Sequence, residues 1–96
     1  MKGITVMKEI KVAAKSEVGK VAGAITAELK ANGEISAIAV GPHAVNQLVK
    51  AIATSKGQLA STNDSLTCAP SFKEVTIDDE KRTGVLFYIT RIEGGK

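Results

Sequence analysis

The sequence of 96 residues has few cysteines and no long apolar run, and both shortages exclude classes of protein. Cys68 is the only cysteine, so no intrachain disulfide can form and nothing indicates a secreted, oxidising environment. No apolar run approaches the roughly 20 residues that span a bilayer, and the first residues, MKGITV, lack the apolar centre of a signal peptide. We therefore expect a cytoplasmic protein that does not enter a membrane.

The sequence also has few of the side chains that catalysis and metal binding use. His43 is the only histidine, and nothing in the pattern brings it beside Cys68 as a nucleophile and its base would require. Asp78, Asp79 and Glu80 lack the spacing of a calcium loop. Val18-Gly19-Lys20 lacks the glycine-rich lead and the Ser or Thr of a phosphate loop. We expect no catalytic residue, no metal and no cofactor, and hence no enzyme.

The composition that remains is that of one ordinary globular domain, with 44% hydrophobic and 24% charged residues. Its charge is unevenly spread. Residues 1–57 hold eight lysines and four glutamates, for a net charge of +4, whereas residues 58–96 hold five basic and six acidic residues, for a net charge of −1. Basic side chains in the first part could form a phosphate-attracting patch or a solvated surface that binds nothing.

The first part of the chain contains a strand pattern followed by a helix pattern. Apolar and other side chains alternate over Glu9–Ala14, which predicts a half-buried strand. Apolar residues from Val18 to Leu29 follow helical spacing, with Ser16 as a candidate N-cap and Asn32-Gly33 as a stop. The apolar run Ile35–Val40 then predicts an interior strand.

The second part contains a helix and a pair of strands. The helix starts at Gly41-Pro42 and closes before Gly57, and a loop follows over 58–64. The next strand, Ser65–Ile77, is interrupted near Pro70, which marks a bulge or an edge position. A turn over 78–81 and a strand over 83–92 complete a hairpin.

The resulting order β-α-β-α-β-β predicts an α+β fold with one mixed four-stranded sheet and two helices. The order alone does not settle the layering, but each helix has a single apolar stripe, which favours two layers. We assign residues 8–92 to this domain, 1–7 to an N-terminal extension and 93–96 to a flexible tail.

Two helix starts offer groups suited to binding rather than to reaction. The starts near Ser16 and Gly41-Pro42 have free backbone N–H groups that can hold phosphate oxygens, and Lys15 and Lys20 flank the first. Polar side chains follow the second start at spacings of three and four, on one face of the helix: His43, Asn46, Gln47 and Lys50. The alternative is that this face is only solvated.

The stretch AVGPHAVNQLVKA, from Ala39 to Ala51, resembles the signature of the stage V sporulation protein S family, in which a glycine turn precedes an Ala-x-Asn-Gln-x-x-Lys-Ala helix. The resemblance extends over residues 8–92. That family is grouped with Alba-like proteins, which share this element order, form dimers and bind DNA or RNA with little demand on sequence. In those proteins the loop after the first strand, the start of the second helix and the final hairpin approach the nucleic acid. The positions that this resemblance assigns are Lys15, Ser16, Lys20, His43, Asn46, Gln47, Lys50, Lys81 and Arg82.

These observations leave two functions open. The first is a dimer that binds the phosphate backbone of DNA or RNA, since one tyrosine and two phenylalanines provide few surfaces for base stacking. A homodimer or higher homo-oligomer is expected because the last strand has apolar residues on both faces, Val85, Phe87 and Ile89 on one and Leu86 and Tyr88 on the other. The second is a protein-interaction or assembly module, for which the acidic turn Asp78–Glu80 could contact a partner.

Overall fold

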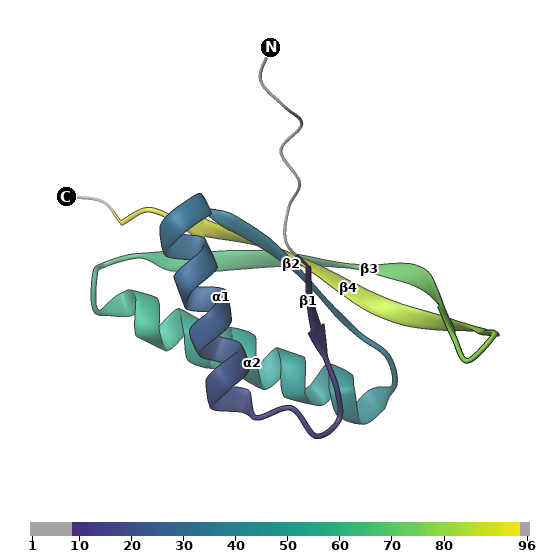
Figure 1. The fold of residues 1–96 in the computed structure, drawn as a ribbon. Helices are drawn as coiled ribbons and strands as arrows, with labels where there is room; N and C mark the ends of the chain where they lie inside the picture. The colour runs from purple at the N-terminus through teal and green to yellow at the C-terminus, as the bar shows by residue number, and fades with distance from the viewer. Residues whose placement is uncertain (1–8, 95–96) are drawn as a thin grey trace, which may run out of the picture.

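The computed structural model describes residues 9–94 and has the element order expected from the sequence (Figure 1). The expected N-terminal extension lies outside the described residues. The elements are β1 (Glu9–Val12), α1 (Val18–Asn32), β2 (Glu34–Ala39), α2 (Pro42–Ala60), β3 (Ser65–Ile77) and β4 (Glu80–Ile92).

The four strands form one mixed sheet in the order β1-β2-β4-β3. β1 is parallel to β2, and β4 runs antiparallel to both of its neighbours, so β3 has the direction of β2. The connections through α1 and α2 therefore cross the sheet in the same sense, and right-handed crossovers then place both helices on one face. Figure 1 shows this arrangement, which confirms the two-layer α+β fold.

The core lies between the helices and alternate residues of the central strands. Ile35 on β2 is opposite Ile89 on β4, Ala37 is opposite Phe87, and all four are buried. The helices add the buried side chains of Ile25, Leu29, Leu48 and Leu59. Neither helix of residues 9–94 covers the other face of the sheet. There Tyr88 is exposed and donates a hydrogen bond to the Glu34 carboxylate.

β3 and β4 extend beyond the rest of the sheet as a two-stranded hairpin arm, residues 73–84. β2 pairs with β4 only as far as Val85, so none of the other described strands lies beside the arm. Asp78 and Asp79 form its turn with positive φ of 50° and 64°, the geometry of a tight two-residue hairpin turn. An ion pair of 3.1 Å between Lys73 Nζ and Glu9 Oε2 connects the base of the arm to β1.

Two predicted interruptions are absent. α2 passes through Gly57 to Ala60, because the helical path buries Leu59 completely. Burying a leucine contributes about 1.5–3 kcal/mol, more than the roughly 1 kcal/mol that a helical glycine costs. β3 is continuous through Pro70, which pairs with Phe87 without a bulge. Pro70 does lie on an edge strand, where its missing N–H need not donate to the sheet.

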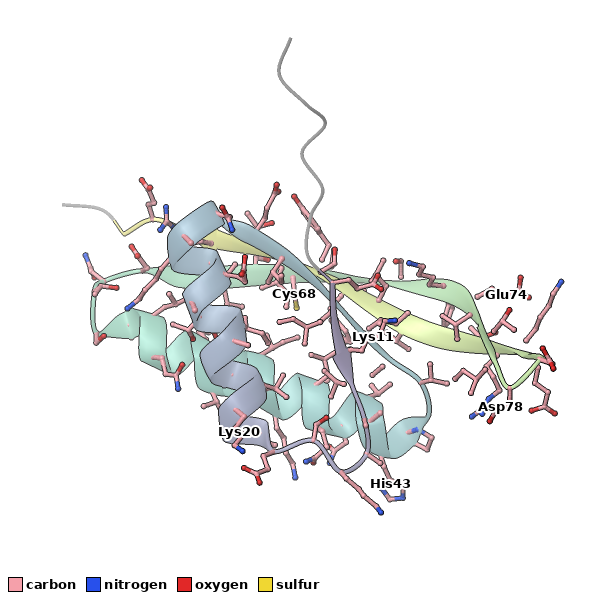
Figure 2. The ribbon with its side chains drawn as sticks, in the orientation of Figure 1. Lys11, Lys20, His43, Cys68, Glu74 and Asp78 are labelled. Carbon is pink, nitrogen blue, oxygen red and sulfur yellow. The ribbon has the colours of Figure 1, made fainter. Side chains whose placement is uncertain are left out.

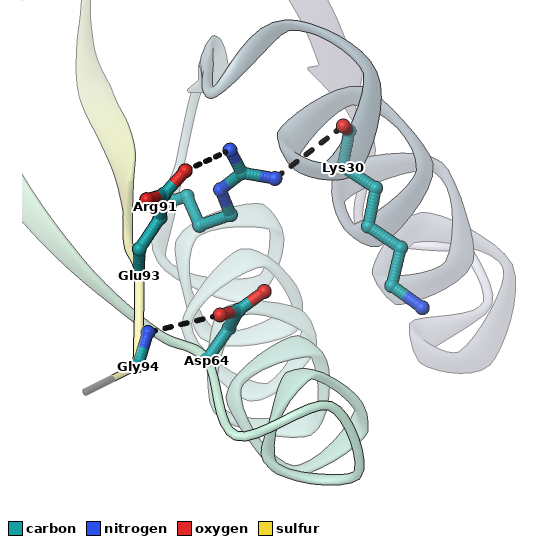
Figure 3. A network of polar contacts seen from close by, with 5 residues as sticks. All are labelled: Lys30, Asp64, Arg91, Glu93 and Gly94. Carbon is teal, nitrogen blue, oxygen red and sulfur yellow. Dashed lines mark hydrogen bonds and ion pairs between the residues drawn. The ribbon is translucent and has the colours of Figure 1, made fainter. Parts of the chain in front are cut away.

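Polar contacts fix the end of β4 against the end of α1 and the loop that follows α2 (Figure 3). The Arg91 guanidinium donates to the Lys30 carbonyl oxygen at 3.4 Å, at the C-terminal end of α1, and pairs with Glu93 at 3.0 Å. Gly94 N donates to Asp64 Oδ1 at 3.0 Å. Glu93 and Gly94 thus contact the domain, while residues 95–96, the rest of the expected flexible tail, lie outside the described part of the chain.

Candidate functional site

The loop between β1 and α1 is a tight turn closed by two hydrogen bonds between the same two residues. Ser16 N donates to the Ala13 carbonyl oxygen at 3.0 Å, and Ala13 N donates to Ser16 Oγ at 2.9 Å. Ser16 is therefore not the N-cap that the sequence predicts, because its hydroxyl closes this turn. The N-cap of α1 is Glu17, which makes no capping hydrogen bond through its side chain.

The Gln47 side chain joins this turn to α2. Gln47 Nε2 donates to the Ser16 carbonyl oxygen at 2.9 Å, across 31 positions of sequence, and the contact is partly buried. This bond places the β1–α1 loop beside the beginning of α2, so Lys15 and the first turns of both helices lie at one end of the helical layer. Figure 2 shows Lys20 and His43 at this end.

Both helices begin there without an acidic residue in the first turn and without a side-chain cap. Gly41, the N-cap of α2, has φ of 92°, a conformation that glycine adopts without steric cost. The backbone N–H groups of the first turns have no partner within their helices. One carboxylate is close, because Glu17 Oε1 lies 3.9 Å from Lys20 Nζ, with both side chains mostly exposed.

On the predicted polar face of α2, three side chains are exposed and one is hydrogen-bonded to the β1–α1 loop. His43, Asn46 and Lys50 are exposed, whereas Gln47 is only partly exposed and is bonded to Ser16. Three donor or cationic side chains of α2 are thus available to an incoming anion. Sequence periodicity placed all four on one face, but it could not show that Gln47 faces the β1–α1 loop.

Lys81 and Arg82, the remaining predicted site residues, lie on the hairpin arm. Lys81 is opposite Thr76 and Arg82 opposite Val75, and successive residues of a strand face opposite sides. A hollow of about 440 Å³ separates the arm from β1, and Val75 lines it together with Ile38 and Ala14. Thr76, which is opposite Lys81, lines the same hollow, so both cations stand opposite residues that border it, although their own side chains face opposite sides of the arm. Ala13 and Ala14, next to Lys15 in the chain, also line this hollow, so it lies between the hairpin arm and the β1–α1 loop.

The described residues contain no constellation that suggests a reaction. Within residues 9–94, no group of three or more His, Cys, Asp or Glu side chains is placed to hold a metal ion. Cys68 is half-buried on β3, at the register position opposite Ile89. Among the helices of the described segment, none is both long and apolar enough to cross a membrane.

Comparison with known proteins agrees with this fold. Residues 8–92 match the family model described as Stage V sporulation protein S. The solved structure of Alba from Thermoplasma volcanium superposes with a TM-score of 0.60 at 12% sequence identity, covering 90% of this chain and 100% of that one. At this identity the likeness establishes the fold. Both matches confirm the resemblance read from the Ala39–Ala51 stretch.

Proposed function

The chain belongs to the stage V sporulation protein S family, and from this premise we propose that it binds nucleic acid through the phosphate backbone and catalyses no reaction. The observation that carries the proposal is the bond between Gln47 and Ser16, which brings two separate donor-bearing segments to one end of the molecule. Lys15 and Lys20 come from one segment, and His43, Asn46 and Lys50 from the other.

The proposed mode is contact with the nucleic-acid backbone rather than with bases. Lysine ammonium groups, helix N-terminal N–H groups and the Asn46 amide can all donate to phosphate oxygens. The three aromatic residues in the whole chain offer little for stacking on bases, and Phe87 is buried in the core. DNA and RNA present the same phosphates, so this surface accommodates either.

We also propose that the chain acts in the cytoplasm as a homodimer or higher homo-oligomer. Phe72 on β3 is 82% exposed and Val49 on α2 is 48% exposed. Exposed apolar side chains that gather in one patch are typical of a surface that a partner covers, and Phe72 is the most exposed of the large apolar residues described. A second copy of the chain would present its own cluster of lysines to the same nucleic acid, and two linked clusters bind more tightly than one.

Salt-dependent titration tests the binding proposal. Single-stranded and double-stranded DNA and RNA of equal length are titrated with the protein over a series of salt concentrations. Backbone contacts release counterions, so the affinity should fall linearly in a plot of log affinity against log salt for every sequence tested. A protein that binds none of these nucleic acids at low salt would refute the proposal and favour the alternative, a protein-interaction module that uses the acidic end of the hairpin arm.

A further inference from the structure

We infer that Gln47 is a positioning residue, which fixes the β1–α1 loop on α2 and acts on nucleic acid through Lys15 rather than by touching the ligand. The ligand in this inference is the nucleic acid of the proposed function, so that part rests on the proposed function. The geometry is that of the free protein. It separates Gln47 from Asn46, its neighbour on α2, which is exposed and open to direct contact.

The loop is held from two sides. Within it, Ser16 and Ala13 exchange two hydrogen bonds, of 3.0 and 2.9 Å, which close the turn but leave its position on the domain unspecified. The bond from Gln47 Nε2 to the Ser16 carbonyl oxygen, 2.9 Å long, supplies that position. Lys15 lies inside the turn and its side chain is exposed. Its backbone is therefore fixed by groups that are not themselves needed for contact with a phosphate.

A fixed loop strengthens binding for an entropic reason. A mobile loop must be ordered when it binds, and the lost conformational freedom reduces the affinity. A loop that is ordered beforehand avoids this loss. The hydrogen bond of the Gln47 side chain is partly buried, and it uses one of the two N–H donors of the amide to bind Ser16. Gln47 therefore orders the loop in the free protein, before any ligand binds.

Amide hydrogen exchange of the free protein tests the geometry without any ligand. Gln47→Met keeps the length of the side chain and removes the donor. We expect the Ser16 and Ala13 amides to exchange about five-fold faster in this variant, the factor that matches the loss of one ordinary hydrogen bond. Ser55→Ala is the matched control, because it removes a hydrogen bond between α1 and α2 away from the loop. It should leave both loop amides at their wild-type rates. Unchanged loop exchange in Gln47→Met would overturn the inference.

A double-mutant cycle then tests the effect on binding. Gln47→Met should weaken binding to a DNA duplex about five-fold in the wild-type background. In the Lys15→Ala background the same change should have little further effect, because the loop no longer presents its cation. Asn46→Ala, as the control for a direct contact, should weaken binding by the same factor in both backgrounds. Equal factors for Gln47→Met in both backgrounds would show direct contact and refute the positioning role. Failure of the wild-type protein to bind would refute the proposed function itself, and the exchange result would still decide the geometry.

Discussion

The hydroxyl oxygens of Thr26 and Ser55 lie 2.7 Å apart in the buried contact between α1 and α2. Thr26 has one hydroxyl proton and donates it to Gln58 Oε1 at 2.6 Å, so Ser55 is the donor in the bond between the two hydroxyls. The chain of donors therefore runs from Ser55 through Thr26 to Gln58. It connects α1 to α2, because Thr26 is on α1 and the other two residues are on α2.

This direction predicts unequal effects of removing the two hydroxyls. Thr26→Val keeps the side-chain shape but leaves the Ser55 hydroxyl buried without its acceptor, so it should lower the free energy of unfolding by about 1–3 kcal/mol. Ser55→Ala leaves Thr26 bonded to Gln58 and should cost about 1 kcal/mol. The double variant should cost less than the sum, because the unsatisfied hydroxyl is gone. Urea denaturation measures all three, and a larger cost for Ser55→Ala would contradict the donor order.

The lysines of the candidate site should determine the salt dependence of binding. If each of Lys15, Lys20 and Lys50 neutralises one phosphate, their joint replacement by Ala should lower affinity for all sequences and reduce the logarithmic salt slope by about 3. Lys30→Ala is the control, since Lys30 is in the last turn of α1, at the other end of that helix. It should leave the slope unchanged. A folded triple variant with the wild-type affinity and slope would place the interface elsewhere.

Phe72 should be required for self-association. The residue is 82% exposed, and covering its aromatic ring removes a large apolar surface from water. We expect light scattering at tens of micromolar to give a dimeric mass for the wild-type chain and a monomeric mass for Phe72→Lys. Phe72→Leu keeps an apolar side chain and should stay dimeric. A monomeric mass for the wild-type chain would exclude the dimer.

Two glycines should respond in opposite directions to replacement by Ala. At Gly84 a Cβ would lie 3.1 Å from Val40 Cγ2 and 3.2 Å from the Ala39 carbonyl oxygen, so Gly84→Ala should destabilise the fold by about 1–3 kcal/mol. At Gly57 in α2 a Cβ meets nothing within 4 Å. Gly57→Ala should stabilise by about 0.5–1 kcal/mol, because Ala loses less backbone freedom in a helix. Urea denaturation of both variants decides the signs.

Tyr88 should titrate above the usual tyrosine pKa of about 10. The hydrogen bond that its hydroxyl donates to Glu34 raises this pKa, and partial desolvation raises it further. Tyr88 is the only tyrosine and the chain has no tryptophan, so tyrosinate absorbance reports this residue alone. The midpoint should be higher in the folded protein than in urea, and Glu34→Gln should lower the folded value. Equal midpoints in the folded and unfolded protein would contradict the bond.

The order of the elements could be predicted from sequence because local periodicity determines it. The two layers were only favoured by the single apolar stripe of each helix, and they follow from the strand order. Alternation in β1 and helical spacing in α1 are readable over a few residues. The end of α2 could not be predicted in this way. Gly57 is a local signal for the end of a helix, and the burial of Leu59 overrides it. The helix ends instead where Asn63 adopts a positive φ of 65° and the Ser61 and Thr62 hydroxyls bond to carbonyl oxygens of the last turn.

The candidate site was predictable only in part, because local periodicity does not show contacts between residues far apart in the sequence. Periodicity put His43, Asn46 and Lys50 on one exposed face, as the structure has them. It could not show that Gln47 bonds to Ser16, since that contact joins residues 31 positions apart. It also placed Lys81 in a turn and began the last strand at 83, whereas β4 begins at Glu80 and so has Lys81 and Arg82 on opposite sides of the arm.

The strand order has a consequence for how the chain reaches this fold. β4 is the last strand in the sequence, yet it lies inside the sheet between β2 and β3. Among the four described strands β3 pairs with β4 alone, so it cannot join them before β4 is present. During synthesis the β1–α1–β2 unit and α2 leave the ribosome first, with the backbone N–H and C=O groups along one edge of β2 unpaired. The sheet can close only when the final strand has emerged, and a nascent chain shortened within β4 would lack the strand that joins its two halves.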